Sequence, residues 1–379
     1  MEERIKEAAR HFEALLREQL QRQERMAQGT QPKDYEHAER IVIGIADGDG
    51  IGPIIMREAR RAAEKLLREE IASGRVELRD VPGLTIENRL ALGESVPAET
   101  LAAIRACDVF LKGPTTTPKG GTLESANVTL RRELDLYANV RPVCVPEEGI
   151  DWIFFRENTE GEYTLGSRGV EIPGALSMDF KVTTDAGTRR IARAAFDYAR
   201  ANGKTSVAIV TKANIMKKTD GMFSRIAHEV AADYPEITAE DWYIDIMTAN
   251  LVNPALRSRF QVFLLPNLYG DIITDEAAQI QGGVGTAGSA NIGGSCAMFE
   301  AVHGSAPRKI ENGEGDYANP SSILKALELL LRHIAMPEKA DRLAEALHVC
   351  TETERRVVVT GHRDGATCRA FGDYLLEKL

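Results

Sequence analysis

Short apolar runs, each followed by a loop and an amphipathic segment, constrain the fold of this chain more than any other feature. The runs include IVIGIA, DVFLKGP, SVAIVTK and FQVFLLPN. Strands of this length that alternate with helices predict a largely parallel sheet covered on both faces. The predicted class is therefore α/β, and 379 residues are enough for two lobes.

Two segments differ from this alternation. Residues 1–28 carry apolar side chains at helical spacing, which predicts one amphipathic helix, and a polar linker follows up to residue 40. This helix is either an exposed helix packed loosely on the main body or an oligomer contact. Residues 163–184 are rich in Gly, Ser and Thr, which predicts an extended arm or hairpin.

Composition excludes several functional classes. The formal net charge of −10 disfavours nucleic-acid binding, and an acidic ligand would require locally concentrated Arg and Lys. The five cysteines are scattered, which argues against a disulfide framework and a structural zinc site. With no signal or transit pattern and no apolar run of about 18 residues, we expect a cytoplasmic protein without membrane contact.

Polar and basic residues cluster around one predicted helix start. Ser125, Asn127 and Arg131 are spaced i, i+2 and i+6, and Arg141 and Arg156 follow within apolar surroundings. A planar guanidinium pairs bidentately with a carboxylate, so three of them could clamp several carboxylates at once. A surface ion pair is the ordinary alternative for each arginine taken alone.

A second cluster is acidic. Asp271 and Asp275 are four residues apart, so on a helix they share one face, and Asp245 lies upstream. Paired carboxylates suit Mg²⁺ or Mn²⁺, whereas acidic charge at a helix N-terminus is the alternative. Lys212 and Tyr163 are a possible base and acid if their surroundings shift their pKa values, but neither residue is informative alone.

Six motifs follow one another along the chain: GDGIGP, KGPTTTPKGG, RENTEGEY, KANIMKKTDG, NLYGDIITDEAA and EAVHGSAP with a later ANP. Together, and in this order, they resemble the motifs of the isocitrate and isopropylmalate dehydrogenase family. The resemblance implies a two-lobed homodimer with shared active sites. The large dinucleotide-binding domain would comprise residues 41–136 and 282–379. The small domain would comprise 137–281, with a dimerisation arm near 163–184. The extension 1–40 lies outside the resemblance.

The resemblance also implies roles for individual residues. Arg131, Arg141 and Arg156 would bind substrate carboxylates, and Asp271 and Asp275 would hold the metal. Asp245 and Lys212 would come from the neighbouring subunit, Lys212 assisting removal of the hydroxyl proton. Tyr163 would protonate the carbon that loses carbon dioxide. The dinucleotide site would be lined by Thr117, His303, Gly304, Ala306, Pro307, Arg308, Lys309 and Asn319.

Substrate and cofactor follow from departures within the family pattern. Ser125 and Asn127 favour a tricarboxylate such as isocitrate, because polar side chains against an isopropyl group would lose hydrogen bonds at about 1–3 kcal/mol each. Homoisocitrate and 3-isopropylmalate are the alternatives. Arg308 and Lys309 favour NADP, although VVVTGHRDGATC lacks the expected second half of an NADP site, and NAD stays open. Retention of Lys212, Tyr163 and the aspartates disfavours a non-catalytic regulatory subunit or a pure binding protein.

Overall fold

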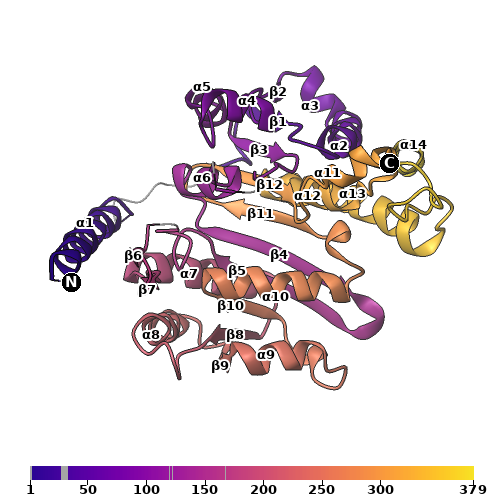
Figure 1. Cartoon of the computed structure of the whole chain (residues 1–379). Helices are drawn as coiled ribbons and strands as arrows, with labels where there is room; N and C mark the ends of the chain where they lie inside the picture. Colours follow the sequence, from indigo (N-terminus) through magenta and orange to yellow (C-terminus); the bar gives the residue numbers. More distant parts are fainter. Residues whose placement is uncertain (1, 27–32, 119, 122, 167) are drawn as a thin grey trace. The chain divides into compact units, whose positions relative to one another are not determined.

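The computed structural model describes residues 2–26, 33–118, 120–121, 123–166 and 168–379. The chain forms two compact units (Figure 1). Unit 1 comprises Met1–Gln31 and Tyr137–Ala277, and unit 2 comprises Pro32–Leu136 and Ala278–Leu379. The chain therefore passes from one unit to the other at residues 31/32, 136/137 and 277/278. The assignment of dinucleotide binding to one lobe remains a prediction.

Unit 2 alternates strands with helices, as the apolar runs predicted. Its strands are β1 (Ile41–Ala46), β2 (Val76–Asp80), β3 (Val109–Lys112), β11 (Gly288–Ile292) and β12 (Ala297–Ala301). Its helices are α2 (Gly52–Leu66), α3 (Arg68–Ala72), α4 (Ile86–Leu92), α5 (Ala98–Arg105), α6 (Ala126–Glu133), α11 (Pro307–Glu311), α12 (Ser321–His333), α13 (Pro337–His348) and α14 (Cys368–Lys378).

The strands of unit 2 lie in the order β2-β1-β3-β12-β11. The first four are parallel, with Ile43 opposite Val109, and β11 runs antiparallel to β12. All six residues of β1 and all four of β3 are buried, as expected for parallel strands covered on both faces. Phe110, Ile104 and Leu130 belong to the core packed against this sheet.

Unit 1 repeats this pattern. Its strands are β4 (Ala138–Val145), β5 (Ile150–Glu157), β6 (Val170–Ile172), β7 (Leu176–Met178), β8 (Ser206–Thr211), β9 (Thr238–Tyr243) and β10 (Val262–Leu265). Its helices are α1 (Glu2–Met26), α7 (Asp185–Ala201), α8 (Thr219–Ala231), α9 (Ile244–Leu251) and α10 (Asn267–Ile280), the last of which ends in unit 2.

The main strands of unit 1 lie in the order β4-β5-β10-β8-β9. The pairs β5–β10, β10–β8 and β8–β9 are parallel, and β4–β5 is antiparallel. The rings of Trp152, Phe154 and Phe263 pack together at this sheet, with Phe154 stacked on Phe263 at 4.3 Å. The predicted α/β class with a largely parallel sheet is therefore confirmed.

The two exceptional segments are a helix and a hairpin. The predicted N-terminal helix is confirmed as α1, and β6 and β7 form an antiparallel pair within the predicted arm. The predicted linker between α1 and β1 lies partly outside the described residues. Among the helices that the structure describes, none is long and apolar enough to cross a bilayer.

This topology explains why candidate residues follow strands. Lys212 comes directly after β8, Asn267 two residues after β10, and Arg156 is the penultimate residue of β5. All three strands are parallel neighbours, so their carboxyl ends meet at one edge of the sheet of unit 1. Ligands of open α/β sheets bind at this edge.

Candidate active site

Two carboxylates on α10 face two buried arginines in unit 1. Asp271 and Asp275 are one turn apart, as the sequence predicted. The Arg141 guanidinium donates to Asp275 Oδ1 at 3.3 Å and to Thr274 Oγ1 at 2.6 Å, and it lies 3.7 Å from Asp271. Arg156 forms a close ion pair with Asp271. Four predicted site residues are thus brought together.

Arg156 is held in place along its whole length. Its side chain is 1% exposed, and its Nε and Nη2 donate to Asn267 Oδ1 at 3.0 and 2.7 Å. Its aliphatic stem passes Gly270, where a Cβ would lie 2.5 Å from Arg156 Cγ. The glycine of NLYGD is therefore required by the close approach of this arginine. The role of Asn267 was not predicted from the sequence.

Tyr163 joins the same cluster. Its hydroxyl donates to Asp271 Oδ2 at 2.8 Å, and the Arg156 guanidinium lies 5.4 Å from the centre of its ring. The pKa of Asp275 is raised, chiefly because burial disfavours its charged form; Arg141 opposes this shift and Asp271 adds to it. Two neighbouring carboxylates, of which Asp275 is disfavoured in its charged form, make a site that a divalent cation would stabilise.

Lys212 and Asp245 form a separate pair. Lys212 Nζ donates to Asp245 Oδ1 at 2.6 Å, and this hydrogen bond is the main cause that lowers the pKa of Asp245. The Lys212 backbone N–H donates to Asp220 Oδ2 at 2.7 Å, which fixes the turn after β8. Within this chain the structure brings Asp245 to Lys212 rather than to the aspartates of α10.

Arg131 has buried charged partners in unit 2 that the sequence did not reveal. It lies on α6, 9% exposed, with its Nη2 3.3 Å from Glu300 Oε1. Glu300 is also 3.2 Å from Lys112 Nζ and accepts from Asn291 Nδ2 at 3.0 Å. Burial alone would raise the pKa of Glu300, but Lys112 and Arg131 lower it to about 2. Among the described residues, the buried Nε of Arg131 has no acceptor, which leaves a donor for a ligand carboxylate.

The two residues predicted to determine substrate specificity lie close to Arg131 in sequence. Ser125 immediately precedes α6, and Asn127 lies in its first turn with Oδ1 accepting from Thr115 Oγ1 at 3.3 Å. Both side chains are partly exposed. They are therefore accessible polar groups on the segment that carries Arg131.

The predicted dinucleotide loop contacts the glycine-rich turn after β1. Ile51 N donates to Ser305 O at 3.0 Å, and a Cβ on Gly50, whose φ is +58°, would lie 2.1 Å from the same oxygen. Asp49 accepts from Thr116 N and Ile86 N, both at 2.7 Å. The GDGIG turn therefore lies against the loop that follows β12, and Asp49 fixes the backbone at Ile86 and Thr116, a role that its spacing alone could not show.

Residues 303–319 follow β12 as a loop and a short helix. His303 lies against Gly304 O at 2.9 Å, and burial lowers the pKa of this histidine. Ala306 adopts φ +45° before Pro307 begins α11, while Thr117, Pro307 and Arg308 are exposed. Asn319 Oδ1 accepts from Ser321 N at 2.9 Å. No atom of the described residues lies within 4 Å of a Cβ placed on Gly304, so the backbone is open there to a ligand.

Basic residues converge beside α11. Lys309 Nζ donates to Gly361 O, and Arg363 Nη2 donates to Asn312 O at 3.0 Å. The segment that contains His362 and Arg363 therefore packs against α11. This contact places a segment distant in sequence beside the helix that carries Arg308 and Lys309.

The aspartates of α10 fit the implied divalent cation. Asp271 and Asp275 supply hard oxygen donors on one helix face, with side chains 41% and 62% exposed. In the part of the chain that the structure describes, no group of three or more His, Cys, Asp or Glu could hold a metal ion. The pair on α10 thus fits a cation that takes further ligands from substrate or a second subunit.

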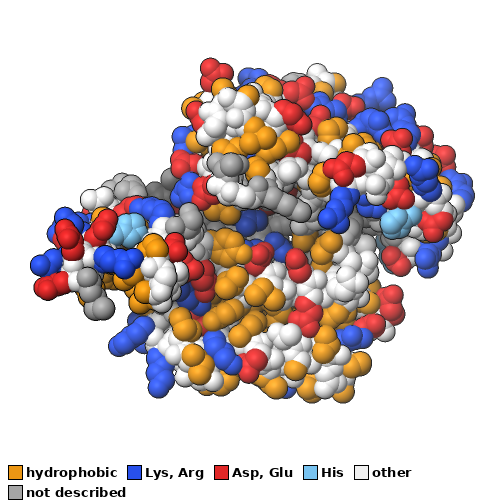
Figure 2. All heavy atoms as spheres, in the orientation of Figure 1, with side chains coloured by type: hydrophobic (Ala, Val, Ile, Leu, Met, Phe, Trp, Pro, Cys, Tyr) orange, Lys and Arg blue, Asp and Glu red, His pale blue; other side chains and the backbone are white. Residues whose placement is uncertain are grey.

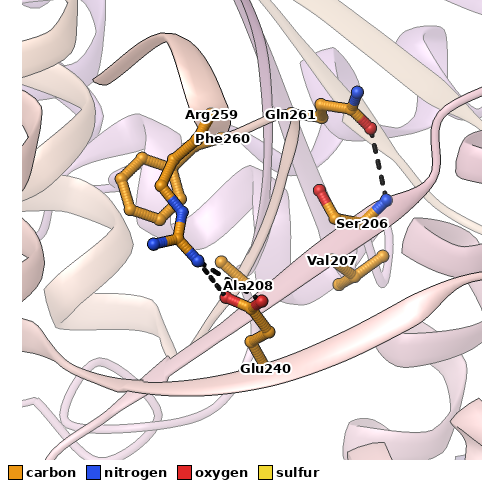
Figure 3. A pocket seen from close by; sticks show the side chains of 7 residues that line it. All are labelled: Ser206, Val207, Ala208, Glu240, Arg259, Phe260 and Gln261. Carbon is orange, nitrogen blue, oxygen red and sulfur yellow. Dashed lines mark hydrogen bonds and ion pairs between the residues drawn. The ribbon is translucent and has the colours of Figure 1, made fainter. Parts of the chain in front are cut away.

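A cavity of about 60 Å³ elsewhere in unit 1 does not involve these residues (Figure 3). Arg259 and Glu240 form an ion pair there at 3.0 Å, and Gln261 Oε1 accepts from Ser206 N at 3.2 Å. The polar groups on its wall are therefore paired with one another. Its lining consists of Ser206, Val207, Ala208, Glu240, Arg259, Phe260 and Gln261.

Comparison with known proteins gives consistent matches. The family model for isocitrate/isopropylmalate dehydrogenase matches residues 42–375. The chain is 37% identical over 348 residues to the probable isocitrate dehydrogenase (NAD) subunit alpha, mitochondrial, of Caenorhabditis elegans, covering 89% of this chain and 92% of that protein. It is 40% identical over 319 residues to the isocitrate dehydrogenase (NADP) of Rickettsia felis, covering 82% of this chain but only 63% of that protein.

A solved structure shows the same fold. The crystal structure of isocitrate dehydrogenase from Methylococcus capsulatus superposes with a TM-score of 0.78 at 34% identity. The match covers 89% of this chain and 99% of that one. All three matches extend over most of this chain.

Proposed function

We propose, from the premise that this chain belongs to the isocitrate/isopropylmalate dehydrogenase family, that it oxidises and decarboxylates isocitrate to 2-oxoglutarate while reducing a nicotinamide dinucleotide. One observation carries the proposal: two buried guanidiniums and one phenol converge on two carboxylates of α10. Such a cluster can hold a polyanionic acid and a divalent cation together.

Three arginines would bind the substrate carboxylates. Arg141 and Arg156 are already oriented by Thr274 and Asn267, so little side-chain freedom is lost on binding. Arg131 is oriented by Glu300 and retains a donor at Nε. Planar guanidiniums pair bidentately with carboxylates, so the three arginines together suit a polycarboxylic acid.

Ser125 and Asn127 favour isocitrate over an alkyl-substituted malate. Their side chains are partly exposed at the start of α6, where a third carboxylate could accept from them. An isopropyl group at this place would desolvate both without offering hydrogen bonds, at about 1–3 kcal/mol each. Homoisocitrate retains a carboxylate and is the nearest alternative.

Aspartates of two subunits would hold Mg²⁺ or Mn²⁺. Asp271 and Asp275 would act from one chain and Asp245 from its partner, which agrees with the separate position of Asp245 here. When bound, the ion supplies Lewis acidity at the substrate hydroxyl and the keto oxygen. The protein contributes the fixed positions of its carboxylates.

The remaining residues would move protons. A bound nicotinamide would supply the hydride acceptor for the hydroxyl-bearing carbon, and Lys212 of the neighbouring subunit would accept the hydroxyl proton. The keto acid then loses carbon dioxide, and the electron pair of the broken bond remains on the carbon framework as an enolate. Tyr163 delivers a proton to that carbon, and its hydroxyl is held in place by Asp271.

Replacing Tyr163 by Phe should slow decarboxylation more than hydride transfer, because only the first step needs the phenolic proton. General acid catalysis contributes at least about a hundredfold, so a loss of that size is expected. The keto acid intermediate can be supplied directly, and its decarboxylation and its reduction by reduced dinucleotide measured separately. Equal losses in the two half-reactions would contradict the role of Tyr163.

NADP is the proposed dinucleotide. Arg308 is exposed at the start of α11, Lys309 follows it and donates to Gly361 O, and Arg363 donates to Asn312 O just after this helix. These cations would attract the 2′-phosphate that distinguishes NADP from NAD. Relatives of both cofactor types are similar to the chain, so the proposal depends on these local charges.

Changing Arg308 to Asp should therefore lower kcat/KM for NADP by about tenfold to a hundredfold, the value of one hydrogen bond to a charged group. The kcat/KM for NAD should change by less than about threefold, because NAD carries no phosphate there. The NAD measurement on the same variant is the internal control. A parallel loss with both dinucleotides would show that Arg308 does not recognise the phosphate.

A homodimer completes the proposed site, since Lys212 and Asp245 would act across the interface. Figure 2 shows hydrophobic side chains on the face of unit 1 that carries α9 and α10. Ile246, Val252 and Ile272 are 47%, 55% and 60% exposed. An apolar patch of this kind marks a contact surface.

Sedimentation should give twice the chain mass for the wild-type protein, and Ile272→Glu should shift the sedimenting mass towards that of the monomer and abolish turnover. A fully active monomer would exclude a shared site.

The whole proposal is tested by absorbance at the reduced-nicotinamide band. Isocitrate, homoisocitrate and 3-isopropylmalate would each be supplied with Mn²⁺ and with NAD or NADP. We expect isocitrate to give the highest kcat/KM. Preference for another of these acids would make that acid the substrate in place of isocitrate. Failure to turn over any of them would favour a regulatory subunit. A cytoplasmic location remains a prediction from the sequence.

A further inference from the structure

Helix α1 precedes the part of the chain matched by the family model and packs against the rest of unit 1 through several contacts. Leu15 is 2% exposed, the Phe12 ring lies 5.2 Å from that of Phe180, and His11 lies against Arg168 O at 2.9 Å. The Arg168 guanidinium donates to Glu18 at 2.9 Å. The helix therefore has a defined place beside the segment that contains β6 and β7.

Beneath α1 lie two acidic side chains that are almost completely buried. Glu157 and Glu160 are 2% and 3% exposed. Glu157 accepts from Thr159 N at 3.0 Å and from Glu160 N at 2.6 Å, and Glu160 accepts from Thr184 N at 2.9 Å. These bonds fix the loop that runs from the end of β5 towards Tyr163.

The charge of this acidic pair is compensated from two helices. Arg22 of α1 lies 3.4 Å from Glu160 Oε1 and donates to Thr159 Oγ1 at 3.1 Å, and its side chain is only 16% exposed. Arg190 of α7 donates to the same Thr159 hydroxyl at 2.9 Å. Burial and the neighbouring Glu157 raise the pKa of Glu160 to about 7, and Arg22 opposes that rise.

A continuous set of contacts leads from this pair to the candidate active site. Asn267 Nδ2 donates to the backbone oxygen of Glu160 at 3.0 Å, while Asn267 Oδ1 accepts from Arg156. Arg156 in turn pairs with Asp271, to which Tyr163 donates. A change in the Glu160 backbone would therefore displace both an arginine and the phenol.

We propose that Arg22 is a positioning residue for the proposed reaction. From α1 it compensates the negative charge of the Glu157–Glu160 pair, and so holds residues 158–163 in their catalytic arrangement. The inference rests on the proposed function for its turnover measurement, whereas its hydrogen-exchange measurement does not depend on that function. An extension outside the matched family region would thereby take part in a site whose other residues lie within it.

The test compares Arg22→Met with Arg22→Lys and with Arg17→Met. Arg17 lies on the same helix and, among the described residues, pairs only with exposed Glu13, so its replacement controls for a general effect on α1. Hydrogen exchange is followed at the amides of Thr159, Glu160 and Thr184, which donate to the buried carboxylates. The pH dependence of kcat with isocitrate is measured in parallel.

Arg22→Met should accelerate exchange at these amides by more than about tenfold, since an uncompensated buried charge favours local opening. It should also move the acid limb of the kcat profile upwards by about one pH unit, because Glu160 then faces Glu157 with Arg190 as the remaining counter-charge. Arg22→Lys should restore most of the wild-type behaviour, and Arg17→Met should leave both measurements unchanged.

The double variant Arg22→Met/Glu160→Gln decides the matter if Arg22→Met alone does not fold. A neutral amide needs no counter-charge and does not titrate, so the double variant should fold and the acid limb that Glu160 sets should be absent. Arg22→Met that matches Arg17→Met in exchange and pH profile would overturn the proposal, as would a double variant that keeps a shifted acid limb. A wild-type protein without isocitrate turnover would instead overturn the proposed function, and the exchange data would still test Arg22.

Discussion

Replacing Asp271 by Asn is expected to lower kcat/KM for isocitrate by about a thousandfold and to weaken Mn²⁺ binding, since this carboxylate joins every part of the unit 1 cluster. It accepts from Tyr163 at 2.8 Å, pairs with buried Arg156 and lies 3.7 Å from Arg141. An amide retains the shape but loses the charge that a divalent cation and two guanidiniums require.

Glu276→Gln is the matched control for this substitution. Glu276 lies on the same helix, and its pKa is raised by burial alone, without a charged partner as a cause. Turnover by steady-state kinetics and Mn²⁺ affinity by calorimetry should change little in this variant. If Asp271→Asn retained wild-type Mn²⁺ affinity, or if both variants lost activity equally, Asp271 would not be a metal ligand.

Buried apolar runs made much of the fold predictable. β1, β3 and β10 are completely buried; β1 and β10 are uninterrupted by charged residues, and β3 is apolar up to Lys112. β4 was not recognised because Arg141 and Pro142 lie within it, and neither residue is typical of a strand interior. β11 was missed because GSANI is short and rich in small polar residues. Its strand structure depends on pairing with β12, which is tertiary information.

The site was predictable in its charged residues but not in their supports. Arg141, Arg156, Asp271 and Asp275 could be singled out by residue type and spacing, and unit 1 brings them together. Asn267, which aligns Arg156, precedes the acidic motif by only four residues but carries no charge that would mark it. A single sequence shows which groups are chemically capable, whereas their partners are chosen by the packing of distant strands.

Glu300 is the clearest example of a residue whose role could not be predicted from the sequence alone. It occupies an apolar strand, AMFEA, and its partners Lys112 and Arg131 are far away in the sequence. Nothing local distinguishes it from an exposed acid. Parallel pairing of β12 with β3 places Glu300 opposite Lys112, and this register creates the buried ion pair.

Replacing Glu300 by Ala should therefore destabilise unit 2 by about 3–5 kcal/mol, because Lys112 and Arg131 would stay charged and buried without their common partner. Urea denaturation followed by circular dichroism measures the loss. The double variant Lys112→Met/Glu300→Gln should lose less than the single substitution, since it removes both members of one ion pair. A single variant within about 1 kcal/mol of wild type would show that the pair does not stabilise the fold.

The same carboxylate predicts a pH dependence of opposite sign from that of a buried neutral acid. The pKa of Glu300 is lowered to about 2 in the folded protein, below its ordinary value of 4.5. Its contribution to the free energy of unfolding is therefore fully present above about pH 4.5 and is lost as the pH falls towards 2. Glu300→Gln should be less stable at neutral pH but should lose less stability across this acidic window. An equally steep acidic loss in that variant would assign the pH dependence to other carboxylates and leave Arg131 oriented by packing rather than by charge.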